Sequence, residues 1–300
     1  MKEIVVVSGK GGTGKTSVLA SFAALAEKAV MADCDVDAAD LHLVLTPEIE
    51  RREEFRSGRQ AVIRGEDCNG CGACLEQCRF DAVKRDGRAA GEAAFSIDPT
   101  ACEGCGVCVR FCPTKAIEFP ERLCGEWYVS RTRFGPMVHA RLGIAAENSG
   151  KLVTLVRRKA REIAMRDERD LLLVDGPPGI GCPVIASITG ASAVLVVTEP
   201  TLSGEHDFER LLVLSRQLEV PVAVCVNKWD LNPEIAARIE DHAAAQGAAV
   251  MGRVRYDHSV TAAQIQAKAV VELGGPSAVD VKKLWDAVQG FLGGKNGSSG

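Results

Sequence analysis

The 300-residue sequence has no long apolar segment and no strong excess of charge of either sign. No apolar run reaches the roughly 18 to 20 residues that a helix needs to cross a bilayer. The formal net charge of −4 gives no reason to expect nucleic acid or an anionic membrane as a partner. The first residues lack the charged-then-apolar pattern of a secretion signal. We therefore expect a cytoplasmic protein that binds neither nucleic acid nor membrane.

Cysteine is the residue type with the most uneven distribution. Eight of the 12 cysteines lie between Cys68 and Cys112, and the others are isolated. Disulfide scaffolds are typically short and secreted, so clustered cysteines in a cytosolic chain indicate a metal site. Among the isolated ones, Cys34 and Cys225 lie at or close to predicted strands and are expected to be small buried hydrophobic residues.

Short β-branched runs alternate with segments that have apolar residues at helical spacing. This alternation predicts an α/β fold with a mostly parallel sheet flanked by helices on both faces. The expected strands are residues 4–8, 29–32, 152–156, 171–175, 193–198, 222–226 and 249–254. The expected helices are residues 15–28, 157–166, 204–218, 233–246, 259–268 and 277–291. Residues 137–142 could add a strand, paired with residues 128–131 or 152–156.

An internal repeat interrupts this alternation. CNGCGACLEQCRFDAV begins at Cys68, and CEGCGVCVRFCPTKAI begins 34 residues later at Cys102. Two copies dominated by cysteine do not make a helical solenoid, so we interpret them as a small duplicated domain inserted into a larger one. The expected domain limits are 1–57 and 121–292 for the larger domain and 58–120 for the insert, with a disordered Gly/Ser-rich tail at 293–300.

Residues 9–16, GKGGTGKT, fit the phosphate-binding pattern G-x-x-x-x-G-K-[ST] between a predicted strand and a predicted helix. The glycines let backbone N–H groups face phosphate oxygens, and the helix N-terminus adds favourable partial charge. Lys15 is expected to reach the β- and γ-phosphates, and Thr16 to hold Mg²⁺ through its hydroxyl. The alternative is a glycine-rich turn that matches by chance.

Lys10 is a second lysine in this loop and completes the narrower pattern K-G-G-x-G-K-[ST]. This pattern resembles the deviant phosphate-binding loop of the MinD/ParA/Mrp ATPases and the nitrogenase iron protein. The resemblance implies that Lys10 crosses a dimer interface and touches phosphate in the other subunit, so that hydrolysis depends on dimerisation. A solvated lysine in a mobile loop is the alternative.

Two further segments resemble the same family. In MADCDVDAADLHL, the family's D-x-D element implies that Asp35 orients or deprotonates the attacking water and that Asp33 lies near the Mg²⁺ shell. In LLLVDGPPGIG, Asp175 resembles the aspartate that binds Mg²⁺ through water, and residues 176–181 resemble a switch that senses the γ-phosphate. An open α/β sheet places its ligand site at the carboxyl ends of its strands, where these residues fall.

The segment VNKWD literally matches the guanine-reading motif N-K-x-D, whereas the resemblance implies that Asn227 contacts adenine. We therefore expect ATP, and GTP stays open. The resemblance implies catalytic roles for Lys10, Lys15 and Asp35. It implies nucleotide contacts for Gly9, Lys10, Gly11, Gly12, Thr13, Gly14, Lys15, Thr16, Ser17 and Asn227.

Both cysteine repeats read C-x₂-C-x₂-C-x₃-C, the spacing of bacterial two-cluster ferredoxins, in which the fourth cysteine ligates the other cluster. This pattern assigns one [4Fe–4S] cluster to Cys68, Cys71, Cys74 and Cys112, and the second to Cys102, Cys105, Cys108 and Cys78. Arg79 stands where proline usually follows the fourth cysteine, which is expected to alter the second cluster's surroundings without abolishing ligation. Zinc, the alternative metal, prefers two separated pairs of cysteines.

Together these motifs resemble a MinD/ParA/Mrp-superfamily ATPase with an inserted, ferredoxin-like α+β domain. The implied protein is a dimer, either a homodimer or a heterodimer with a paralogue, that couples Mg-ATP hydrolysis to an iron–sulfur module. Its output would be electron transfer, or assembly or delivery of a metal cluster, to an unidentified redox or metallocluster client. A positioning or scaffold ATPase with a structural or redox-sensing insert is the alternative. Cys182 could ligate a cluster shared across the dimer, although we expect a packing role.

Overall fold

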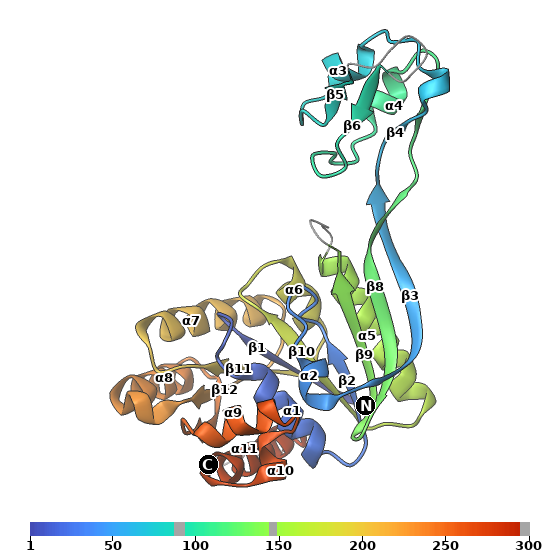
Figure 1. Cartoon of the computed structure of the whole chain (residues 1–300). Coiled ribbons are helices and arrows are strands. Elements are labelled where there is room, and N and C mark those ends of the chain that lie inside the picture. Colours follow the sequence, from blue (N-terminus) through green and yellow to red (C-terminus); the bar gives the residue numbers. More distant parts are fainter. Residues whose placement is uncertain (87–93, 144–148, 295–300) are drawn as a thin grey trace. The chain divides into compact units, whose positions relative to one another are not determined.

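The computed structural model describes residues 1–86, 94–143 and 149–294, which form two compact units (Figure 1). The first unit comprises Met1–Glu53, Glu126–Leu142 and the described residues from Ser149 onward, and the second comprises Glu54–Gly125 and Gly143. The boundary between them falls inside two long strands, β3 (Glu48–Arg59) and β8 (Glu121–Thr132). The predicted insert, residues 58–120, begins inside β3 and ends just before β8. Of the predicted tail, residues 295–300 lie outside the described part of the chain.

The first unit is built on one sheet of nine strands in the order β13-β12-β11-β1-β10-β2-β9-β8-β3. The pairings from β13 across to β9 are parallel, so the predicted mostly parallel α/β sheet is confirmed. Residues Ile4 to Val7 of β1 are fully buried, as expected for a strand covered on both faces. The bounds of the remaining strands are β1 (Lys2–Ser8), β2 (Ala29–Asp33), β9 (Gly135–Leu142), β10 (Leu171–Pro178), β11 (Ala193–Thr198), β12 (Val222–Asn227) and β13 (Ala249–Val254).

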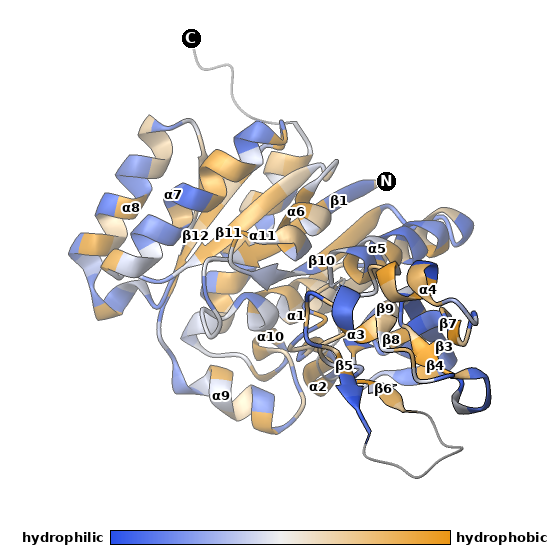
Figure 2. Ribbon diagram, turned by 90° about the horizontal axis from the view of Figure 1, so that it is seen from above, coloured by the Kyte–Doolittle hydropathy of each residue, from blue (hydrophilic) through white to orange (hydrophobic). Residues whose placement is uncertain are grey.

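Helices cover both faces of this sheet. One face packs against α1 (Lys15–Leu25), α2 (Leu41–Leu45), α10 (Val270–Leu273) and α11 (Pro276–Leu292), with α9 (His258–Ile265) beside α10. The other packs against α5 (Ser149–Arg166), α6 (Cys182–Ile188), α7 (Leu202–Gln217) and α8 (Pro233–Ala245). Figure 2 shows hydrophobic strands β11 and β12, whereas α7 and α8 carry both hydrophobic and hydrophilic stretches. No helix among the described residues is both long and apolar enough to cross a bilayer.

The prediction of a strand at residues 152–156 is wrong, because these residues lie in α5. Leu152, Val153, Val156, Ala160 and Ile163 are buried along this helix, so the apolar run is part of one helical stripe. Residues 137–142 form part of β9, which lies between β2 and β8. Of the two partners that the sequence left open for them, residues 128–131 lie in the neighbouring strand β8 and residues 152–156 lie in a helix.

β3 has no counterpart among the strands expected from the sequence. Its sequence, EIERREEFRSGR, is mostly charged and exposed and shows no apolar alternation. β3 is the last strand at its end of the sheet, where charged side chains disfavour pairing with another chain.

The second unit consists of short elements around the cysteines. The helices α3 (Ala73–Gln77) and α4 (Val107–Phe111) each follow a glycine with a left-handed backbone, Gly72 and Gly106. Two small antiparallel sheets pair β4 (Val62–Ile63) with β7 (Ile117–Glu118), and β5 (Val83–Arg85) with β6 (Phe95–Ile97). Residues 87–93, between β5 and β6, lie outside the described residues.

A buried ion-pair network links β1, α5 and α6. Both nitrogens Nε and Nη2 of Arg157 donate to Glu3 Oε1, at 2.8 and 2.6 Å, and each side chain is only 5% exposed. Nη1 of Arg157 donates to the carbonyl oxygens of Ala186 and Thr189, at the end of α6. Arg161 also pairs with Glu3. Because Glu3 is shielded from water, its charge depends on these partners.

We expect Arg157→Met to destabilise the first unit by about 3 kcal/mol, since it removes both donors to Glu3 Oε1 and leaves the buried carboxylate with Arg161 alone. It also leaves the carbonyl oxygens of Ala186 and Thr189 without their donor. The matched control is Arg158→Met, because the Arg158 side chain is 64% exposed and lies 3.8 Å from Glu162. That change is expected to cost less than about 0.5 kcal/mol. Urea unfolding followed by tryptophan fluorescence measures both, since all three tryptophans lie in the first unit. If both variants lost the same free energy of unfolding, the buried ion-pair network would not be the source of the stability that Arg157 provides.

Candidate functional site

The loop between β1 and α1 is held in place by Asn227 at the end of β12. Asn227 Nδ2 donates to the carbonyl oxygen of Thr13 at 2.7 Å. Gly14 has φ of +90°, and a Cβ placed there would lie 2.4 Å from Asn227 Nδ2. Position 14 therefore requires glycine for its backbone conformation and for the close approach of Asn227.

The start of the same loop packs against α7. A Cβ at Gly9 would lie 2.0 Å from Cβ of Asp207, a distance at which the two atoms cannot coexist. At Gly11, by contrast, an added Cβ would meet no atom of the described residues within 4 Å. Packing against Asp207 therefore requires glycine at position 9, whereas the described residues leave room for a side chain at position 11.

Lys15, at the first position of α1, lies between two carboxylates from neighbouring strands. Its Nζ is 2.7 Å from Asp35 Oδ2 and 3.5 Å from Asp175 Oδ1. Burial lowers the pKa of Lys15, but the charges of Asp175 and Asp35 outweigh it and the pKa is raised. Thr16 donates its hydroxyl to Asp175 Oδ2 at 2.8 Å. The structure thus brings four of the predicted site residues into direct contact.

Asp175 Oδ1 and Thr13 Oγ1 are both buried without a hydrogen-bond partner among the described residues. Burial raises the pKa of Asp175, and Lys15 and the Thr16 hydroxyl oppose that rise. A buried carboxylate oxygen without a hydrogen-bond partner, close to a threonine hydroxyl, is a suitable ligand for a divalent cation that prefers oxygen. The residues therefore fit the predicted Mg²⁺ site.

Asp33 is fully buried and serves its own loop. Its carboxylate oxygens accept hydrogen bonds from the backbone N–H groups of Asp35, at 3.1 Å, and Leu41, at 3.3 Å. Burial, and next the charge of Asp175, raise its pKa well above the ordinary value. These bonds fix the turn that directs Asp35 towards Lys15 and start α2.

Lys10 pairs with Glu199, which follows β11, and not with the carboxylates around Lys15. Lys10 Nζ lies 3.1 Å from Glu199 Oε2, and its side chain is 40% exposed. Lys228 pairs with the other oxygen of Glu199 and also donates to the Gly12 carbonyl oxygen at 3.2 Å. Of the two loop lysines, Lys15 is therefore enclosed by its carboxylate partners and Lys10 is accessible to solvent.

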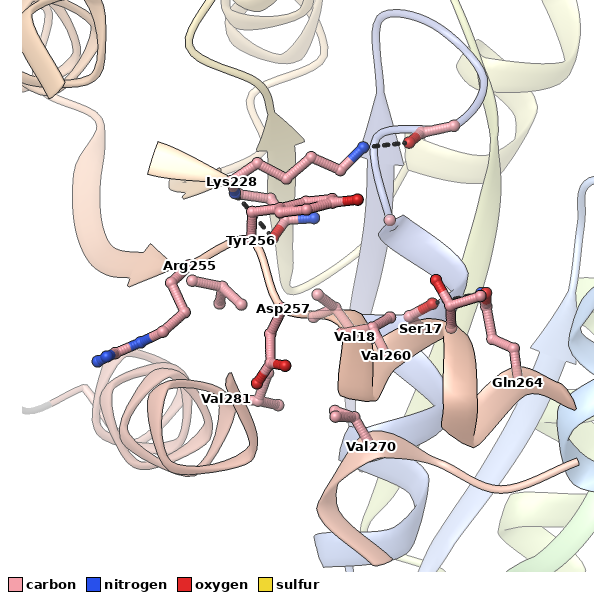
Figure 3. Close-up of a pocket in the computed structure, with 15 residues that line it drawn as sticks. Ser17, Val18, Lys228, Arg255, Tyr256, Asp257, Val260, Gln264, Val270 and Val281 are labelled. Carbon is pink, nitrogen blue, oxygen red and sulfur yellow. Dashed lines mark hydrogen bonds between the residues drawn. The ribbon is translucent and has the colours of Figure 1, made fainter. Parts of the chain in front are cut away.

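A cavity of about 170 Å³ adjoins the loop (Figure 3). Figure 3 shows Val260 beside Val18 and Ser17 of α1, and Gln264 Nε2 donates to Ser17 Oγ at 2.9 Å. Arg255, Tyr256 and Asp257, which follow β13, also line the cavity, together with Lys228. Of this lining, sequence motifs indicate only the loop with Ser17 and Asn227. The other lining residues after β13 could have been expected from their position, because they follow the carboxyl end of a strand that pairs with β12. In this pairing Asn227 lies opposite Val254.

The sequence model described as the CobQ/CobB/MinD/ParA nucleotide binding domain matches residues 4–270. The chain belongs to this family. The phosphate-binding loop, Asp33, Asp35, Asp175 and Asn227 all fall within the matched residues, so the cluster around Lys15 belongs to a nucleotide-binding domain of the MinD/ParA type.

Among related sequences, the Methanocaldococcus jannaschii protein MJ0578 is 35% identical over 233 residues, covering 77% of this chain and 79% of that protein. MJ0579 of the same organism is 24% identical over 241 residues, covering 77% and 82%. Among solved structures, the cell division ATPase MinD of Pyrococcus furiosus has a TM-score of 0.56 at 17% identity, covering 97% of this chain and 99% of that one. MinD of Pyrococcus horikoshii, in complex with Mg-ADP, has the same score and identity and covers 97% of each chain. These structures share the MinD/ParA fold with this chain.

The cysteines of the second unit form the other candidate site. One cavity is lined by Cys68, Cys71, Cys74 and Cys112, together with Ile63, Phe95 and Ile117. These four cysteines are the ligand set predicted for the first cluster, three from the first repeat and one from the second. Burial raises the pKa of Cys108 to about 11, and Cys102 and Cys105 are close enough to contribute to the rise.

The fourth cysteine of each repeat, Cys78 or Cys112, ends a short helix. Burial raises the pKa of each thiol, but hydrogen bonds from the following residues outweigh burial and lower it. The Ala116 N–H, for example, donates to Cys112 Sγ at 3.3 Å. Such bonds favour the thiolate, the form that ligates metals. Among the described residues, however, no His, Cys, Asp or Glu side chains are already arranged as a set that could hold a metal ion.

The isolated cysteines differ in burial. Cys34 and Cys225 are fully buried, as predicted. Cys182 is exposed at the first position of α6, so the expected packing role is wrong.

We expect Gly9→Ala to lower the free energy of unfolding of the first unit by about 2 kcal/mol, because its Cβ cannot coexist with Cβ of Asp207. Gly11→Ala is the matched control, and its effect is expected to stay within about 0.5 kcal/mol. Urea unfolding without nucleotide compares the two variants. If both were equally destabilised, packing against α7 would not be the reason for Gly9.

Proposed function

We propose that this chain is a Mg²⁺-dependent ATPase whose nucleotide state controls an iron–sulfur module. The single observation that carries the ATPase part is the convergence of Lys15, Thr16, Asp35 and Asp175 behind the phosphate-binding loop. Lys15 would bind the β- and γ-phosphates, and Asp35 would orient or deprotonate the attacking water. Thr16 and Asp175 would hold Mg²⁺, whose charge stabilises the phosphate oxygens during transfer.

The cavity beside the loop supports a nucleoside site, with adenine as the proposed base. In a guanine-reading N-K-x-D motif the aspartate must be available to the base. Here Asp230 Oδ1 already accepts a hydrogen bond from the Tyr256 N–H at 2.7 Å. The Asn227 amide is also occupied, since it donates to Thr13. The engagement of Asp230 favours ATP over GTP, whereas that of Asn227 does not discriminate between the two bases.

Dimerisation on ATP binding is part of the proposal, with either an identical subunit or a paralogue. Its support is the contrast between the loop's two lysines, because Lys15 is enclosed by its own carboxylates and Lys10 is 40% exposed. An exposed cation at the edge of a phosphate site can act on a nucleotide bound to another subunit, as trans-acting cations do in phosphoryl transfer.

For the second unit we propose two [4Fe–4S] clusters, with Cys68, Cys71, Cys74 and Cys112 holding one and Cys102, Cys105, Cys108 and Cys78 the other. The spacing of the cysteines and the cavity shared by the first set support this assignment. Bound clusters of this kind take up and release single electrons. The chain's own contribution is the set of N–H donors around Cys78 and Cys112, which would stabilise thiolate charge.

Coupling between the two sites is supported by the connections of β3 and β8. α2 and β3 follow the Asp33–Asp35 turn directly in the chain. β8 lies next to β9, which pairs with β2, and the Leu142 N–H at the end of β9 donates to the Val36 carbonyl oxygen. A nucleotide-dependent shift of this turn would therefore reach both strands that carry the insert. The output would be electron transfer or metal-cluster delivery to a client protein.

We expect Lys15→Ala to abolish ATP binding and Lys10→Ala to retain it, with hydrolysis reduced at least about 100-fold because charge stabilisation from the partner is lost. Calorimetry with ATP and Mg²⁺, together with phosphate release, measures the two effects. Lys151→Ala, an exposed residue of α5, is the control and is expected to behave as wild type. Wild-type turnover by Lys10→Ala would contradict a role in trans.

Anaerobically reconstituted wild-type protein is expected to bind about eight iron atoms per chain, four in each of two cubane clusters. Cys71→Ser and Cys105→Ser should each reduce this to about four, because each removes one ligand of one cluster. Cys124→Ser is the control in the same unit, since Cys124 lies outside both repeats and donates to the Ser57 carbonyl oxygen. Iron analysis and electron paramagnetic resonance of the reduced protein check the result. Zinc in place of iron would refute the ferredoxin assignment.

A further inference from the structure

Glu199 holds two lysines at the edge of the phosphate-binding loop. Its oxygen Oε2 lies 3.1 Å from Lys10 Nζ, and its oxygen Oε1 lies 2.5 Å from Lys228 Nζ. Only 14% of the Glu199 side chain is exposed. Lys228 is anchored on its other side by the Gly12 carbonyl oxygen at 3.2 Å. Each carboxylate oxygen thus has one lysine, and the two lysines differ in how firmly they are held.

We propose that Glu199 is a positioning residue that retains Lys10 in its own subunit until the triphosphate of a second copy of this chain displaces it. The inference rests on the proposed ATP-dependent dimer. While Lys10 is paired with Glu199, the carboxylate partly offsets the positive charge that Lys10 presents to a partner. A triphosphate carries several negative charges and competes for Lys10 more strongly than one carboxylate does, whereas a diphosphate competes less well.

The position of Lys228 makes this exchange possible at low free-energy cost. Removing the only partner of a carboxylate that is largely shielded from water would leave an unpaired charge, which is strongly unfavourable. Glu199 avoids this state because Lys228 stays on its other oxygen. The pair that breaks involves a lysine that is 40% exposed, and pairs with exposed lysines are weak.

The charge state of Glu199 is consistent with this role. Burial raises its pKa, but the hydrogen bonds and charges of Lys228 and Lys10 outweigh burial, and the pKa is lowered. Glu199 is therefore ionised at neutral pH and able to hold both lysines.

Two substitutions should shift dimerisation in opposite directions. Glu199→Gln keeps the shape but removes the charge that retains Lys10, so the protein concentration at half-dimerisation should fall about two- to fivefold. Lys228→Gln leaves Lys10 as the only cation on Glu199, so the same concentration should rise. Analytical ultracentrifugation with a saturating non-hydrolysable ATP analogue and Mg²⁺ measures both. Glu205→Gln is the control, since Glu205 lies on α7 and pairs with Arg238.

The Lys10→Ala background separates this mechanism from a merely structural role. There, Glu199→Gln should no longer change the dimerisation midpoint, because the retained lysine is absent. If Glu199→Gln left the midpoint unchanged in an otherwise wild-type chain, or raised it together with a loss of nucleotide affinity, the inference would be overturned. A wild-type chain that stays monomeric at every concentration would instead refute the proposed dimer itself.

Discussion

The nucleotide site depends on one enclosed cation, Lys15, held between the carboxylates of Asp35 and Asp175. These three residues come from three places in the sequence, and only the adjacency of β1, β10 and β2 in the sheet brings them together. Burial on its own would disfavour the charged lysine, and the two carboxylates reverse that effect. The strand order is therefore a condition for the charge state of the site.

The same sheet explains how a second unit can be inserted without disturbing the site. The chain leaves after α2 along β3 and returns along β8, and both strands lie at the far end of the sheet, beyond β9. The strands between β13 and β2 that surround the loop keep their parallel pairing. An insertion at the edge adds strands there and leaves the central pairings intact. Only β9 separates β8, which leads back from the insert, from β2.

Sequence patterns with fixed spacing predicted the site better than hydrophobic periodicity predicted the elements. The loop at residues 9–16 needs a strand before it and a helix after it, so the motif specified its own local structure. Residues 152–156 could be either strand or helix by periodicity, and tertiary packing decided for helix. No sequence motif indicated that Tyr256 and Gln264 line the cavity, because their place there results from the position of β13 beside β12.

In the two cysteine repeats, glycines at equivalent positions do not always have the same structural role. Gly72 and Gly106 both adopt the left-handed backbone that starts a short helix, so their roles match. Gly70 and Gly104 do not match. A Cβ at Gly104 would lie 2.2 Å from the carbonyl oxygen of Arg59, whereas at Gly70 the nearest atom of the described residues, Cβ of Ala94, would be 3.5 Å away. Because the end of β3 lies against Gly104, the described backbone sterically excludes a side chain from the second cysteine loop at this position. The connection to β3 thus makes two similar loops physically unequal.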